Sequence, residues 1–168
     1  MAAVIADPIA AGPVSLRPWS ATEADIYLAL RDEAVFRFTT EAPDLALDAC
    51  RQNITDAATD PDRAHFAICD RGARPVGNLA VMRSGAGAMV SYWLAAAARG
   101  KGWAAAALNA STEWAFRTWD LDHVELEIDP ANEGSIRVAR AAGYRRHGLR
   151  LESACGGPAL LFRRRPHD

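Results

Sequence analysis

The sequence predicts an α+β protein built on a mixed β-sheet with flanking helices, and three observations carry this prediction. The 168 residues correspond to about one domain of ordinary size. Half of them are hydrophobic and 24% are charged, as in a globular chain that can form a core. Segments with strand and helix periodicity follow one another in the order β-α-α-β-β-β-α-β-α-β-β. We therefore expect a single domain over residues 14–168.

The first half of the chain begins with two helices behind a short strand. Residues 14–18 alternate like a strand, and residues 20–34 open with the serine, threonine and glutamate of a helix start. A second helix is expected over residues 44–60, where an Asp-Pro turn ends it. Three strands follow, joined by glycine-containing turns, at residues 64–69, 75–82 and 88–94.

The second half alternates between helices and strands. From Trp103 onwards apolar residues recur at i, i+4, i+7 and i+11, which predicts a long helix starting near Gly102. Residues 123–128 alternate strictly, with their aliphatic members facing inward. A helix over residues 135–142 is stopped by Gly143, and two last strands are expected at residues 144–151 and 159–165.

The charge is divided unevenly along the chain. Residues 1–62 contain 11 acidic and 4 basic residues, a net charge of −7, whereas residues 63–168 carry +5, so that the whole chain has −2. A total so close to neutrality excludes a strongly basic nucleic-acid binder. The division itself suggests two kinds of ligand, an anion near the basic part and a cation near the acidic part.

Cysteine spacing and the N-terminus point to a reduced, cytoplasmic protein. Cys50, Cys69 and Cys155 form no C-x-x-C pair, which argues against a disulfide framework or a structural zinc site. Residues 1–13 lack a basic region and contain two prolines, so we expect a flexible tail and not a signal peptide. No run of about 18 uncharged apolar residues exists to span a membrane. We expect no metal and neither nucleic acid nor membrane as a partner.

A glycine-rich turn between residue 94 and the long helix is the strongest candidate binding motif. Gly100 and Gly102 allow a ligand to approach the backbone closely, and the helix N-terminus presents unpaired N–H groups. Together with the helix dipole, these groups favour a phosphate or pyrophosphate, and Arg99 and Lys101 add positive charge. A turn that merely caps a structural helix is the alternative. The spacing of neither an ATP-binding P-loop nor a dinucleotide fingerprint is present.

These residues resemble a known family. Arg99-x-x-Gly102-x-Ala104, following Tyr92-Trp-Leu94, is similar to motif A of the GNAT superfamily of acyl-CoA-dependent N-acetyltransferases. Three later segments resemble its Rim-type branch, which acetylates ribosomal-protein N-termini, namely Asn132-x-x-Ser135, Ala142-Gly-Tyr144 and Gly148-Leu-Arg150. The resemblance covers about residues 14–165, nearly the whole chain.

The resemblance implies where a co-substrate would lie. In this fold the fourth and fifth strands, residues 88–94 and 123–128, run parallel and splay apart, and acetyl-CoA occupies the cleft between them. Its pyrophosphate would lie on the amides of the glycine-rich turn. Its pantetheine would pair like an extra strand with the backbone at the end of the fourth strand and would be contacted from the opposite wall by Asn132 and Ser135. The cofactor-binding residues implied in this way are Trp93, Leu94, Arg99, Gly100, Lys101, Gly102, Trp103, Ala104, Asn132 and Ser135.

The resemblance leaves the acid and the base open. Many relatives carry a tyrosine seven residues after the asparagine, but this chain has Ala139 there. Ser135 resembles the Rim-type hydroxyl near the sulfur and is the candidate acid, with pantetheine binding or helix capping as alternatives. Glu152 is the candidate base, near where Rim-type enzymes place a glutamate, with an exposed strand carboxylate as the alternative. Glu41, in the connection that walls the acceptor site of this fold, is the candidate ligand for an ammonium group.

The function expected is direct transfer of the acetyl group of acetyl-CoA to a primary amine in a ternary complex. The acceptor could be a peptide N-terminal α-amine or a small-molecule amine, and a homodimer is left open. A non-catalytic acyl-CoA-binding or regulatory module is the alternative, favoured by Ala139. A nucleotide-binding protein is a third class.

Overall fold

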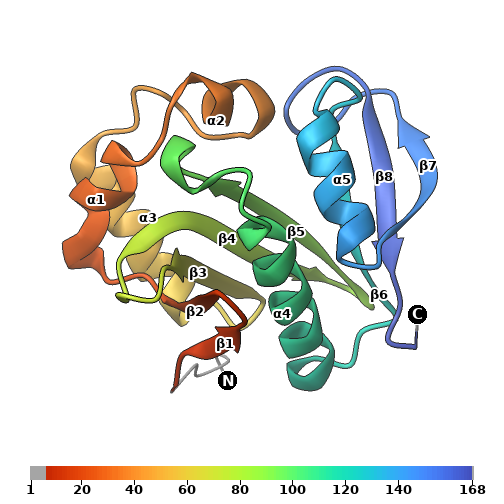
Figure 1. Cartoon of the computed structure of the whole chain (residues 1–168), viewed down its shortest axis with the longest axis horizontal. Helices are drawn as coiled ribbons and strands as arrows, with labels where there is room; N and C mark the ends of the chain where they lie inside the picture. The colour runs from red at the N-terminus through yellow and green to blue at the C-terminus, as the bar shows by residue number, and fades with distance from the viewer. Residues whose placement is uncertain (1–6, 168) are drawn as a thin grey trace.

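One eight-stranded sheet forms the centre of the protein in a computed structural model that describes residues 7–167. The strands lie side by side in the order β1-β2-β3-β4-β5-β6-β8-β7 (Figure 1). They are β1 Ile9–Ala11, β2 Val14–Pro18, β3 Arg63–Cys69, β4 Pro75–Ser84, β5 Gly87–Leu94, β6 His123–Ile128, β7 Arg145–Arg150 and β8 Ala159–Arg164.

Helices cover both faces of this sheet, with α4 and α5 on the near side in Figure 1. Within residues 7–167, no helix combines the length and the apolar character that a membrane span needs. The helices are η1 Ala21–Glu23, α1 Ala24–Ala29, α2 Glu33–Phe38, α3 Leu47–Thr59, η2 Ala96–Ala98, α4 Trp103–Thr118 and α5 Glu133–Ala141.

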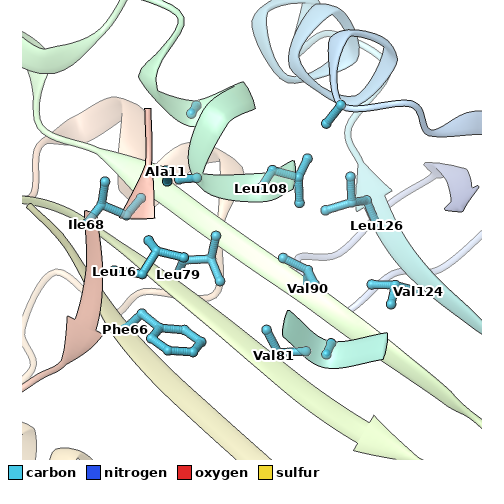
Figure 2. Close-up of a cluster of buried hydrophobic side chains, with 14 of the residues drawn as sticks. Ala11, Leu16, Phe66, Ile68, Leu79, Val81, Val90, Leu108, Val124 and Leu126 are labelled. Carbon is cyan, nitrogen blue, oxygen red and sulfur yellow. The ribbon is translucent and has the colours of Figure 1, made fainter. Parts of the chain in front are cut away.

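Two clusters of buried side chains hold the helices to the sheet. The larger lies under α4 and α5, and Figure 2 shows Leu108 of α4 among side chains that come from strands as far apart as β1 and β6. The smaller cluster, on the other face, joins Val35 of α2 and Ile54 of α3 to Trp93 of β5. Both follow from strand alternation, which sends successive side chains to opposite faces. The two faces of β5 therefore look into different halves of the molecule.

The sheet has one parallel pair among the described strands, and that pair is short. β5 and β6 are in register only where Gly87–Met89 lie beside His123–Glu125. Beyond this point β5 stays paired with β4 as far as Leu94, while β6 continues to Ile128 beside β8. The two strands thus separate toward their C-terminal ends. The expected α+β fold with a mixed, largely antiparallel sheet and a parallel, splayed fourth and fifth strand is confirmed.

Two local expectations differ from the structure. Ile9–Ala11 were expected within a flexible tail but form β1, which pairs with β2 from Ile9 beside Leu16 to Ala11 beside Val14. Residues 1–6 of that expected tail lie outside the described residues. The single helix expected over residues 20–34 is interrupted, because the carboxylate of Asp32 accepts a hydrogen bond from the N–H of Val35 (3.1 Å) and begins α2. The other strands fall within two residues of their predicted bounds.

Candidate active site

The gap between β5 and β6 opens a cleft of about 540 Å³ that reaches both faces of the sheet. Alternate residues of β5 line it from opposite sides. Tyr92 and Leu94 point toward α4 and α5, with the larger core cluster, whereas Trp93 belongs to the cluster under α1 to α3. Ser91 shares the side of Trp93 by strand alternation and also lines the cleft. A ligand on one face can thus meet a ligand on the other where the strands part.

The glycine-rich turn between η2 and α4 forms one end of this cleft. Gly100 and Gly102 both have φ of +74°, the left-handed conformation that side chains with a Cβ rarely adopt. A Cβ at either position would meet nothing within 4 Å, so the space in front of the turn is open. Within residues 7–167, nothing accepts a hydrogen bond from the N–H groups of residues 100–104, and the first bond back to the turn runs from Ala106 N–H to Gly102 O (3.2 Å). Free N–H groups at the positive end of a helix dipole suit an anionic phosphate.

The charged side chains of this turn already contact other parts of the protein, unlike its backbone N–H groups. Arg99 forms a two-pronged ion pair with Asp32, at 2.9 and 2.7 Å, and its Nε donates to the carbonyl of Leu94 (3.0 Å). Lys101 lies over the ring of Trp103, 4.7 Å from its centroid, and does not line the cleft. Arg99 therefore connects the turn to the start of α2, and the groups of the turn that remain free are its backbone amides.

We expect the Asp32–Arg99 contact to contribute modestly to stability. Asp32→Ala removes both the helix cap of α2 and the partner of Arg99, so it should lower the free energy of unfolding by about 1–2 kcal/mol at pH 7. Urea unfolding measures this, with the neighbouring exposed Glu33→Ala as a control that should have little effect.

The effect of Asp32→Ala should also depend on pH. The Arg99 guanidinium, together with the N–H groups at the start of α2, holds the pKa of Asp32 below its ordinary value. A lowered folded-state pKa stabilises the protein above the ordinary pKa of about 4, and this contribution is lost as the pH falls through the folded-state pKa. The difference in the free energy of unfolding between wild type and variant should therefore shrink as the pH falls from about 5 to about 2. A difference that grows in acid would contradict this account.

The opposite wall of the cleft is the start of α5. Asn132 caps that helix, because its Oδ1 accepts a hydrogen bond from the N–H of Ser135 (3.0 Å), and both residues line the cleft. Facing them from β5 is Tyr92, whose buried hydroxyl has no hydrogen-bond partner among the described residues. Burial raises the pKa of Tyr92 to about 12, and the nearby Ser135 side chain lowers it in part. Tyr92 is thus a protonated donor beside the cleft. Sequence reasoning assigned it no role, although strand alternation places it opposite Trp93.

Glu41 lies in the cleft wall on the α1 to α3 side, and its carboxylate already accepts hydrogen bonds from within the protein. It accepts hydrogen bonds from the hydroxyl of Tyr27, from Arg31 (3.0 Å) and from the indole N–H of Trp93 (3.2 Å). Burial, followed by the adjacent Glu41, raises the pKa of Tyr27, so its hydroxyl stays protonated and donates. This geometry makes Glu41 an anchor for the β5 tryptophan.

A second carboxylate in the wall, Glu127, was missed by the sequence reasoning. It sits on β6 opposite the inward-facing Leu126 and Ile128, lines the cleft, and forms an ion pair with Nε of Arg150 (3.0 Å). The strict alternation of residues 123–128 was the signal that could have found it. Glu152, the base expected from the resemblance, lies exposed beyond β7 and does not line the cleft.

The structure brings most of the expected site residues to this one cleft and leaves a few elsewhere. Lys101 and Glu152 are outside it, and Ala139, at the position of the family tyrosine, is fully buried in the core. The expected site residues that line the cleft are Glu41, Trp93, Leu94, Arg99, Gly100, Gly102, Trp103, Ala104, Asn132 and Ser135.

Comparison with known proteins agrees with this architecture. The family model described as the acetyltransferase (GNAT) domain matches residues 14–145. Because the match spans most of the chain, the protein belongs to the GNAT acetyltransferase family and is an acetyltransferase. The resemblance drawn from the sequence is confirmed.

Individual relatives and solved structures are similar to this chain. The probable N-acetyltransferase YjcK of Bacillus subtilis is 26% identical over 149 residues, covering 81% of this chain and 82% of its own. The structure of Mycobacterium smegmatis RimJ, in complex with CoA-disulfide, superposes with a TM-score of 0.83 at 24% identity, covering 96% of this chain and 87% of its own. A ribosomal-protein-S5-alanine acetyltransferase from Vibrio fischeri also gives 0.83, at 16% identity and with coverage of 96% and 98%. At these identities the structural likeness shows a shared fold and not a shared acceptor.

Proposed function

We propose that this acetyltransferase moves the acetyl group of acetyl-CoA directly onto the nitrogen of a primary amine, with both substrates bound at once. The observation that carries the proposal is the cleft that opens on both faces of the sheet where β5 and β6 part. One face has an anion-binding turn, and the other has a carboxylate beside a mostly apolar chamber. Holding two reactants in one cleft makes a bimolecular step effectively unimolecular.

The residues on the α4 and α5 side fit acetyl-CoA. The amides of residues 100–104 are free to bind the pyrophosphate, and the absence of a Cβ at Gly100 and Gly102 leaves room for it. The pantetheine would lie between the unpaired edge of β5 and Asn132 with Ser135 at the start of α5. When bound, acetyl-CoA supplies the activated acetyl group. A backbone N–H near Leu94 would polarise its carbonyl, the electrostatic contribution that acyl transfer requires.

In this proposal, residues on one side of the gap accept the proton of the amine and residues on the other side donate a proton to the sulfur. The amine must lose a proton to attack, and in this proposal Glu127 accepts it, directly or through water. As the new C–N bond forms and the C–S bond breaks, the sulfur takes up a proton. The hydroxyls of Ser135 and Tyr92 lie on the sulfur side of the cleft, and the raised pKa of Tyr92 keeps that hydroxyl protonated for this task.

Two measurements test the function. Calorimetric titration with acetyl-CoA reports binding, and release of free CoA thiol with a panel of primary amines reports turnover. We expect binding together with CoA release above background for at least one class of amine, either peptides with a free N-terminus or small molecules. Binding without turnover over the whole panel would contradict the proposal.

Ser135→Ala is expected to lower kcat about tenfold with a smaller change in the KM for acetyl-CoA, the size of effect that loss of one hydrogen bond to a charged group gives. Tyr92→Phe should have a similar effect, and steady-state kinetics with varied acetyl-CoA measures both. Tyr144→Phe is the matched control, because that hydroxyl is buried in the core against Thr112 (2.5 Å). A rise in KM at constant kcat would make Ser135 a binding residue only.

A further inference from the structure

The half of the cleft on the α1 to α3 side, here the acceptor chamber, has a mostly apolar wall. Val35 and Phe38 of α2 line it together with Met82 of β4 and Met89 of β5, and Trp93 and Cys155 complete its apolar part. The uncharged polar side chains that also line the cleft here are those of Thr39, Thr40, Asn78 and Ser91. Met82 and Met89 are paired neighbours in the sheet, so their flexible thioether side chains form one surface. Cys155 closes the chamber against α2, with its Sγ 3.9 Å from the carbonyl oxygen of Phe38.

The charges around this chamber do not favour a polycation. The two carboxylates in its wall are each compensated by a guanidinium, Glu41 by Arg31 (3.0 Å) and Glu127 by Arg150 (3.0 Å). A further guanidinium, that of Arg37, lies 4.8 Å from the ring centroid of Phe38 at the chamber wall.

The one other carboxylate that lines the described cleft is exposed to solvent and has no guanidinium partner among the described residues. Asp129 belongs to the connection between β6 and α5, where it accepts a hydrogen bond from the N–H of Ala131 (2.7 Å). Of the two partly buried carboxylates in the described chamber wall, Glu127 keeps capacity to accept from a substrate, because Glu41 already accepts from three donors. Asp129 stays solvated.

From this arrangement we infer that the acceptor is a singly charged primary amine carried on an apolar group, and that polyamines and other polycations are poor substrates. The inference rests on the proposed function and narrows its acceptor. One ammonium finds one carboxylate, Glu127, while its apolar substituent contacts the methionines and Phe38. A second ammonium inside the same chamber would lose water without gaining a second buried carboxylate that is free to accept, and the guanidinium of Arg150 beside Glu127 would repel it.

A pair of amines that differ by one ammonium tests the inference. Pentylamine and 1,5-diaminopentane have the same carbon chain, so the ratio of their kcat/KM values at equal pH and ionic strength isolates the second charge. We expect the ratio to favour pentylamine about tenfold or more. Equal or faster acetylation of the diamine would overturn the inference while leaving the proposed function intact. Bound acetyl-CoA with turnover of neither amine, nor of any other, would overturn both.

A charge placed in the chamber gives a second, independent readout. Met82 is 43% exposed, so Met82→Glu should fold, and it adds to the chamber wall a carboxylate that can pair with a second ammonium. We expect this variant to lower the ratio of kcat/KM for pentylamine to kcat/KM for 1,5-diaminopentane about fivefold or more, because kcat/KM for the diamine rises. Leu151→Glu is the matched control, since Leu151 is 76% exposed and does not line the cleft, and it should leave the ratio unchanged. An unchanged ratio in Met82→Glu, or the same shift in both variants, would contradict the assigned chamber.

Discussion

Gly102→Val is expected to weaken acetyl-CoA binding about 100-fold or more while the protein remains folded. Gly102 lines the cleft with a φ of +74°, and a branched side chain there would both strain that conformation and fill the open space in front of the turn. Losing two charge-assisted hydrogen bonds to phosphate, at about 1.5–3 kcal/mol each, corresponds to a factor of that size. Calorimetric titration of the variant with acetyl-CoA measures the change.

A matched glycine separates loss of binding from loss of stability. Gly85 has φ of +59° in the turn between β4 and β5, has open space around its missing Cβ, and lies outside the cleft. Gly85→Val should therefore incur the same conformational strain, about 1–2 kcal/mol in the free energy of unfolding, without changing the affinity for acetyl-CoA. Full affinity in Gly102→Val would mean that the turn does not hold the phosphates.

Features that depend on local geometry were predictable from the sequence. The alternating strands and the glycine-rich turn are of this kind, because φ, unpaired N–H groups and side-chain alternation are decided within a few residues. β1 was missed because Ile9–Ala11 are only three residues long, and what holds them is the pairing with β2 in the folded protein. The parallel register of β5 and β6 came from the family resemblance and not from the residues of the two strands.

Features that depend on distant partners were not predictable. The phosphate role expected for the Arg99 side chain took no account of Asp32, which is 67 residues away in sequence and holds that guanidinium. Glu41 was expected to offer a free carboxylate, yet Trp93 and two residues of the preceding segment already donate to it. Glu127 is the exception, because the alternation of β6 alone places it opposite the core.

The uneven charge of the chain acquires a more specific meaning on the fold. In the basic part, the groups that are free to bind an anion are backbone amides, because the Arg99 side chain is paired with Asp32 and Lys101 lies over Trp103. The acidic part contributes Glu41, but Arg31 compensates it, so the first helices supply an apolar wall and not a negative one. The carboxylate available to an amine comes instead from the basic part, on β6.

Glu127→Gln is expected to lower kcat about 100-fold or more, within the range that general-base catalysis contributes. Glutamine keeps the shape of the side chain and can still contact Arg150, but it cannot accept the proton of the attacking amine. The variant must then rely on amine that is already neutral in solution. Its kcat/KM should therefore keep rising with pH toward the pKa of the acceptor, about 10 for an alkyl amine, whereas the wild type, which can remove the proton from the bound ammonium, should depend less on pH. Steady-state rates of CoA release from about pH 6 to pH 10 record both profiles.

The neighbouring glutamate on the same strand face decides whether this effect belongs to the site. Glu125 lies two residues earlier on β6, is bound by Arg163 (2.8 Å) and His147 (3.3 Å), and does not line the cleft. Glu125→Gln removes the same charge from the same face of the sheet, so any general effect on folding or on the field of β6 should appear in both variants. We expect only Glu127→Gln to lose turnover and to change its pH profile. Glu127→Gln could instead raise the KM for the amine at constant kcat. A group that only binds contributes equally to the ground and transition states, so that result would make the carboxylate a binding group for the ammonium and would place the base elsewhere in the cleft.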